Sequence, residues 1–77
     1  MTTFEEVRNF VAEQLTADVD TITMDTSLTE DLKADSLDIV QLVMSLEQMF
    51  GLEISDEDLA KLNKISDIVA YVDAHKK

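Results

Sequence analysis

The stretch that decides the fold is DLKADSLDIVQLVMSLEQMF, residues 31–50. Asp35 offers a carboxylate just before an apolar helical pattern, where it can accept hydrogen bonds from the free backbone N–H groups of a first turn. Asp38 follows three residues later, and Gly51 supplies a stop at the other end of the pattern. These signals predict a helix over residues 36–50, the longest in the chain.

This predicted helix has two apolar stripes when it is drawn on a wheel at about 100° per residue. One stripe is broad enough to be buried against other helices, and it consists of Ile39, Leu42, Val43, Leu46, Met49 and Phe50. The second stripe lies apart from it and consists of Leu37, Val40 and Met44. Two interpretations of the second stripe remain open. Either a loop or another helix covers it, or it docks partner proteins, for which methionine's flexibility is suitable.

Similar local signals predict three more helices. Thr3 and Glu6 have capping-box spacing at the start of a helix near residues 4–15. Ser55 precedes an acidic first turn and is expected to cap a short helix, and Asn63 is expected to cap a last one. The apolar residues at helical spacing are Phe4, Val7, Phe10, Val11 and Leu15 in the first helix, and Ile65, Ile68, Val69 and Val72, with Tyr71 at the edge, in the last.

The connection between the first two helices is long, about 20 residues, and unusual in so small a domain. It is rich in Thr and Asp, whose side chains bond locally to the backbone and favour turns. Its apolar residues could pin it across the core, with a short helical turn inside it: Val19, Ile22, Met24, Leu28 and Leu32. The expected fold is therefore an all-α four-helix bundle, with three longer helices, one short helix and this long loop, forming a single domain over residues 1–77.

The composition argues against several functional classes. The 77 residues include no cysteine and one histidine, so neither a thiolate nucleophile nor a zinc-ligand cluster is expected. Seventeen acidic and six basic residues give a formal charge of −11, which repels nucleic acid and favours basic partners. No stretch approaches the roughly 20 apolar residues of a membrane span, and the N-terminus lacks the pattern of a signal peptide. A cytoplasmic protein is expected.

Ser36, at the first position of the predicted 36–50 helix, is the residue with the most interesting chemistry. A serine nucleophile needs a base to take its proton, and His75 lies far along the chain. If Ser36 reacts, another protein is therefore expected to activate it. A helix N-terminus would favour a phosphoester there, although Asp35 and Asp38 would partly repel it. The natural roles of these two aspartates are capping and display to a basic partner.

The segment DSLD at the start of an amphipathic helix, within an acidic chain, closely resembles the acyl carrier proteins of dissociated (type II) fatty-acid synthesis. The likeness extends through the FG that ends the helix and the acidic opening of the next one. It implies that Ser36 carries 4′-phosphopantetheine, attached from coenzyme A by a phosphopantetheinyl transferase. Acyl chains would be held as thioesters on the thiol of that group, and the core would open to enclose them. The protein would be a non-catalytic carrier.

The same resemblance implies a docking face on the 36–50 helix and its start: Asp35, Leu37, Asp38, Val40, Met44 and Glu47. The implied partners present Arg and Lys to this face. They are the phosphopantetheinyl transferase and enzymes of the acyl transferase, ketoacyl synthase, ketoacyl reductase, dehydratase and enoyl reductase types. A monomer is expected.

Some positions depart from the family pattern, and they keep alternatives open. Lys33 stands where glycine is usual, Gln41 and Gln48 where glutamate is frequent, and Met49 where a polar residue is common. A discrete carrier of a polyketide or other specialised pathway is therefore an alternative. A small acidic interaction or calcium-binding protein is a second alternative, suggested by Asp18, Asp20 and Asp25, although the glycine and final glutamate of an EF-hand are missing.

Overall fold

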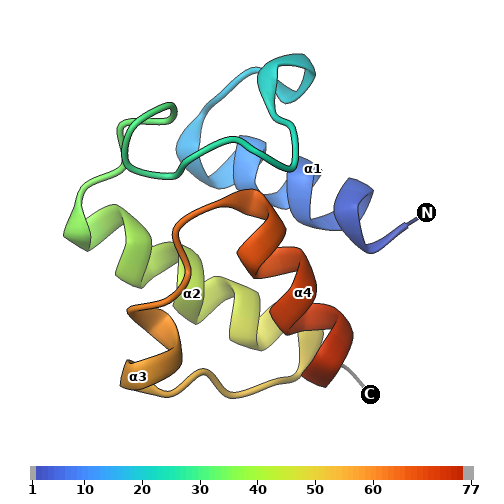
Figure 1. Cartoon of the computed structure of the whole chain (residues 1–77), viewed down its shortest axis with the longest axis vertical. Coiled ribbons are helices and arrows are strands. Elements are labelled where there is room, and N and C mark those ends of the chain that lie inside the picture. The colour runs from blue at the N-terminus through green and yellow to red at the C-terminus, as the bar shows by residue number, and fades with distance from the viewer. Residues whose placement is uncertain (1, 76–77) are drawn as a thin grey trace.

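The computed structural model describes residues 2–75 and contains the four expected helices, three longer and one short (Figure 1). They are α1 (Thr3–Leu15), α2 (Ser36–Phe50), α3 (Asp56–Leu59) and α4 (Ile65–His75), and the long connection holds a 3₁₀ turn, η1 (Val19–Thr21). Residues 2–75 form no strand, so the all-α prediction is confirmed. Among these residues no helix is both long and apolar enough to cross a membrane.

The core lies where α1, α2 and α4 meet. α1 packs most extensively on α4 and also contacts α2 and η1. Side chains with almost no solvent exposure come from all three long helices and from the long connection: Val7, Val11, Leu28, Leu42, Leu46, Ile65, Ile68 and Val72. Burial of each such side chain contributes about 1.5–3 kcal/mol, so these residues are the main source of stability in a chain without disulfides.

The capping box of α1 lies one residue earlier than predicted. Thr2, not Thr3, is the N-cap: its hydroxyl accepts the N–H of Glu5 at 3.2 Å, and the Glu5 carboxylate accepts the N–H of Thr2 at 3.1 Å. Bonds from the Thr2 backbone and hydroxyl lower the pKa of Glu5. Thr3 instead begins the helix and donates its hydroxyl to the carboxylate of Asp73 in α4. The Thr2–Glu5 and Thr3–Glu6 pairs have the same spacing, and the bond from Thr3 to Asp73 in α4 distinguishes them.

The start of α4 also differs from the prediction, because Asn63 is not its side-chain cap. The helix begins at Ile65, and Oδ2 of Asp67 accepts the N–H groups of Asn63 at 3.1 Å and Lys64 at 3.0 Å. The carbonyl of Asn63 accepts the N–H of Leu28 at 2.9 Å. Asn63 therefore belongs to a junction with the long connection, which a local capping pattern does not reveal.

The long connection is held against the start of α4 by backbone bonds. Ile65 N–H donates to the carbonyl of Thr26, and Ser66 N–H to that of Met24, both at 3.0 Å. Ser27 and Lys64 form an isolated antiparallel bridge beside them. Figure 1 shows the connection turning back over the end of the bundle before it enters α2. The irregular backbone is thus well anchored, as the apolar content of the loop predicted.

The apolar residues of the connection are not all used in the core. Leu28 and Ile22 are buried, and Val19 and Leu32 pack partly against the core, as predicted. Met24 is 41% exposed, so its predicted core role is wrong. The carbonyl of Met24 bonds to α4, which fixes its backbone while its side chain points into solvent.

The broad stripe of α2 is buried except at its end. Leu42, Val43 and Leu46 are buried, and Ile39 and Phe50 pack partly against the core. Met49 is 56% exposed, so its predicted place in the core is wrong. It lies at the edge of the buried sector and in the last turn of the helix.

α3 is short and is held by contacts from outside itself. Ser55 caps it as predicted, since its hydroxyl accepts the N–H of Asp58 at 3.2 Å. The Tyr71 hydroxyl of α4 lies 2.9 Å from the carbonyl oxygen of Glu53 and 3.0 Å from Oδ2 of Asp58. Burial raises the pKa of Tyr71, and the hydrogen bond and negative charge of Asp58 add to the rise, with a smaller contribution from the charge of Glu47.

Lys33 lies in a turn that requires an unusual backbone. Its φ is +55°, in the left-handed region where a side chain is strained, and the following N–H, from Ala34, closes the turn on the carbonyl of Leu28 at 2.9 Å. This conformation gives a physical reason for a glycine at this position, where the sequence has lysine.

We expect Lys33→Gly to raise the free energy of unfolding by about 0.5–1 kcal/mol, because glycine adopts a positive φ without steric strain. Denaturant unfolding would measure the change. Lys33→Ala is the control, since it removes the same charge and keeps the Cβ. Equal stability of the glycine and alanine variants would contradict the strain argument.

We expect Tyr71→Phe to lower the melting temperature at pH 7, because it removes the hydroxyl that binds Glu53 and Asp58. The pKa of Tyr71 is raised by folding, so its stabilising contribution is complete below the ordinary tyrosine value of 10.0 and is lost as the pH rises through the higher folded pKa. Thermal unfolding of wild type and Tyr71→Phe from neutral to alkaline pH should show that their difference in melting temperature disappears above the folded pKa of Tyr71. A gap that is absent at pH 7, or that widens in alkali, would refute this role.

Candidate functional site

Ser36 is the first residue of α2, and its side chain is exposed. The backbone around it is fixed by a reciprocal capping box. Oδ1 of Asp35 accepts the N–H of Asp38 at 2.9 Å, and Oδ2 of Asp38 accepts the N–H of Asp35 at 3.3 Å. The predicted helix start is therefore confirmed, and it presents the Ser36 hydroxyl to solvent from a rigid turn.

The surroundings of Ser36 fit an attached anionic group. The first N–H groups of a helix have no partner within the helix, and the helix dipole is positive at this end. Both features favour a phosphate bound to the first residue. The Asp35 and Asp38 carboxylates oppose this attraction, but each already accepts a backbone N–H. Because the hydroxyl is exposed, a second protein can reach it.

The structure does not bring His75 to Ser36. His75 ends α4, on the opposite side of the view in Figure 1 from the start of α2. Its ring stacks on that of Tyr71 with centroids 4.1 Å apart, and its Nδ1 lies 3.0 Å from the Tyr71 carbonyl oxygen. Ser36 and His75 therefore do not form a nucleophile with its base.

The second stripe of α2 faces solvent. Leu37 is 65% exposed, Val40 42% and Met44 57%. Neither the long connection nor another helix covers these side chains, so the interpretation in which the stripe is packed within the fold is wrong for the described chain. Their spacing of three and four residues places them on one face of the helix. The exposed stripe thus runs along α2 away from Ser36.

Acidic residues lie at both ends of this stripe. Asp35 is exposed, and Asp38 is half-buried. Glu47 is also half-buried, and its Oε2 accepts the N–H of Ile54 at 2.9 Å. Sequence reasoning missed the contact with Ile54, because no helical periodicity connects residues on the two sides of the turn at Gly51.

Three other exposed positions of α2 are uncharged. Gln41 and Gln48 are exposed amides, and Met49 is an exposed thioether. The positions where the sequence departs from the family pattern are therefore on the surface, where a partner can contact them. They leave Asp38 and Glu47 as the charged residues within α2.

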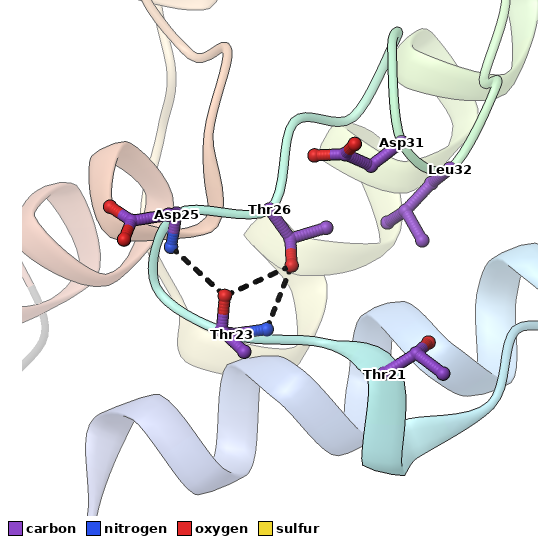
Figure 2. A pocket seen from close by; sticks show the side chains of 6 residues that line it. All are labelled: Thr21, Thr23, Asp25, Thr26, Asp31 and Leu32. Atoms are coloured by element: carbon purple, nitrogen blue, oxygen red, sulfur yellow. Dashed lines mark hydrogen bonds between the residues drawn. The ribbon is translucent and has the colours of Figure 1, made fainter.

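A surface pocket of about 340 Å³ lies elsewhere, in the long connection (Figure 2). It is lined by Thr21, Thr23, Asp25, Thr26, Asp31 and Leu32. Its polar atoms hold turns: the Thr26 hydroxyl accepts the N–H of Thr23 at 2.8 Å, and Oδ2 of Asp31 accepts the N–H of Ser27 at 2.7 Å. These bonds give the pocket a structural explanation.

The calcium-binding alternative has no support in the described structure. Asp18 caps η1, where its carboxylate accepts the N–H of Asp20 at 3.0 Å. Within residues 2–75 no group of three or more His, Cys, Asp or Glu side chains could hold a metal ion. Asp18 thus acts as a cap, and Asp20 and Asp25 donate their backbone N–H groups to Asp18 and Thr23 within these turns.

Three comparisons with known proteins agree. A family model described as "Phosphopantetheine attachment site" matches residues 5–72. The chain is 52% identical over 77 residues to the acyl carrier protein of Campylobacter jejuni subsp. doylei, with 100% of both chains covered. It is 47% identical over 76 residues to the acyl carrier protein of Helicobacter hepaticus, with 99% of this chain and 100% of the relative covered. A solved structure of acyl carrier protein from Enterococcus faecalis has a TM-score of 0.82 and 30% identity, covering 99% of this chain and 100% of that one.

We expect Asp35→Ala to lower the free energy of unfolding by about 1 kcal/mol, because it removes the cap of α2. Asp35→Asn should retain most of the stability, since its amide oxygen can accept the same N–H group from Asp38. Denaturant unfolding of the two variants separates the capping role of Asp35 from the effect of its charge. Equal losses in both variants would show that the charge, rather than the cap, is what stabilises the helix.

Proposed function

The chain belongs to the acyl carrier protein family, and we propose that Ser36 is the residue to which its 4′-phosphopantetheine is attached. As a member of that family it is a non-catalytic carrier of phosphopantetheine-linked acyl chains, as in fatty-acid synthesis. The single observation that carries the assignment to Ser36 is its exposed hydroxyl at the capped start of α2, within the DSLD segment.

The chemistry of the chain supports this assignment. The protein contains no cysteine, so the thiol that holds acyl groups has to come from an attached group, which supplies thioester chemistry when it is present. Ser36 contributes the oxygen of the phosphodiester linkage, and the start of α2 stabilises the negative charge. A separate phosphopantetheinyl transferase has to activate Ser36, because His75 is stacked on Tyr71 at the end of α4 and does not lie beside Ser36.

The docking face of the carrier consists of Asp35, Leu37, Asp38, Val40, Met44 and Glu47. Its exposed apolar stripe provides short-range contact, and its carboxylates attract basic surfaces over a longer range. Such a combination suits fast, transient complexes. The proposed partners are the phosphopantetheinyl transferase and the acyl transferase, ketoacyl synthase, ketoacyl reductase, dehydratase and enoyl reductase of fatty-acid synthesis.

The proposal also covers the organisation of the protein. Residues 1–77 act as a single carrier domain, supported by a family match over residues 5–72 and by relatives that align along the whole chain. The carrier works as a monomer, because the docking face has to stay free for successive enzymes. It works in the cytoplasm, where it reaches the separate enzymes of a dissociated pathway by diffusion.

A second candidate is a carrier of a polyketide or other specialised pathway. The exposed, uncharged Gln41 and Gln48 favour it, since they make the docking face less acidic than is usual in the family. Assays of malonyl loading and elongation with a competent set of fatty-acid enzymes would separate the two candidates. Failure of both reactions with a phosphopantetheinylated carrier would favour the specialised pathway.

We expect wild-type protein incubated with coenzyme A and a broad-specificity phosphopantetheinyl transferase to gain one phosphopantetheine group on Ser36. Intact mass and peptide mapping would measure the modification, and protein isolated with the group already attached would count equally. Ser36→Ala should keep the fold and gain nothing, because it lacks the oxygen that forms the phosphodiester. Attachment to the alanine variant, or at another residue, would refute the assignment.

A further inference from the structure

Glu47 differs from the other acidic residues of the docking face in the direction of its contacts. Asp35 and Asp38 bond to each other's N–H groups at the start of α2. Glu47 instead reaches across the end of α2, where its Oε2 accepts the N–H of Ile54 at 2.9 Å. The Glu47 side chain therefore holds a segment that lies outside its own helix.

The backbone of Glu47 has the same effect as its side chain. Its carbonyl oxygen accepts the N–H of Gly51 and, at 3.1 Å, the N–H of Leu52. Together with the side-chain bond to Ile54, one residue thus fixes three of the N–H groups that follow the helix. Leu52 is buried, and Ile54 packs partly against the core, so these bonds determine how the chain enters the connection to α3.

The connection is held from α4 as well. The Tyr71 hydroxyl bonds to the carbonyl of Glu53, immediately before Ile54. Two neighbouring residues are therefore held by different helices, one by α2 through Glu47 and the other by α4 through Tyr71. α3 has only four residues and follows directly, capped by Ser55, so this pair of bonds and the bond from Tyr71 to Asp58 contribute to its position.

We propose that Glu47, besides its place in the docking face, is a positioning residue for the connection between α2 and α3. This role does not rest on the proposed function, because it follows from the bond to Ile54. For that bond Glu47 has to supply an acceptor oxygen rather than a charge, and the amide oxygen of glutamine is also an acceptor.

Three variants separate the positioning role of Glu47 from the effect of charge. Glu47→Gln keeps an acceptor oxygen for the Ile54 N–H, and Glu47→Ala removes it. Asp38→Asn removes a charge at the other end of α2. Amide hydrogen exchange of Ile54 measures the connection, with the Val11 amide in α1 as a reference for global opening. Binding to a phosphopantetheinyl transferase without coenzyme A measures docking, with unmodified carrier throughout.

The expected result is a difference between the two Glu47 variants. In Glu47→Ala the Ile54 amide should exchange about tenfold faster relative to the Val11 amide, because its bond is lost. Glu47→Gln should stay within about twofold of wild type in the exchange of Ile54, because it keeps an acceptor for that bond. Asp38→Asn should weaken docking about fivefold and leave the Ile54 amide unchanged, because it alters only the charge at the start of α2.

Two results would overturn the proposal. Unchanged exchange at Ile54 in Glu47→Ala would mean that the carboxylate does not position the connection. Exchange at Ile54 that is as fast in Glu47→Gln as in Glu47→Ala would mean that an acceptor oxygen at this position is not enough to hold the connection. A failure of the proposed function would appear differently, as wild-type protein that the transferase and coenzyme A cannot modify, while the exchange experiment would remain informative without any partner.

Discussion

A helix can bury only one side against its neighbours, and α2 has apolar residues on two. The broader stripe is the one that packs against α1, α4 and the long connection, because Leu42 and Leu46 complete a core that no disulfide supports. The narrower stripe is then left in water. An exposed apolar face is a common mark of an interaction site, so the same packing constraint that builds the core also leaves the surface that we propose for docking.

The net charge of the molecule also favours exchange between partners. With a formal charge of −11, the protein repels copies of itself, which favours a carrier that stays separate while it exchanges partners. The start of α2 is a local exception, since the helix dipole there is positive. An anion attached to Ser36 would therefore gain from a local field that the overall charge of the chain opposes. Helix capping by Asp35 and Asp38 keeps this position fixed.

Local signals in the sequence were enough to predict the helices, and tertiary contacts explain where the predictions were wrong. The caps at Asp35, Ser55 and Gly51 lie beside the turns they stabilise, so their pattern was readable. The choice between Thr2 and Thr3 depends on a bond to the last helix, and the role of Asn63 depends on a bond to the long connection. Met49 lies at the border of the buried sector, where helical spacing alone does not decide between burial and exposure.

In the candidate site, too, local features were predictable and tertiary contacts were not. Ser36 and the second stripe were predictable from residue order on one helix, and the exposure of both is a property that one helix wheel can suggest. The inward contact of Glu47 was not predictable, because it depends on the path of the chain after Gly51. The backbone bonds that join residues 24–28 to residues 63–66 have a further consequence, for biosynthesis. During translation residues 24–28 lack these backbone partners until the beginning of the last helix has left the ribosome, so this part of the fold closes late, through contacts of high sequence separation.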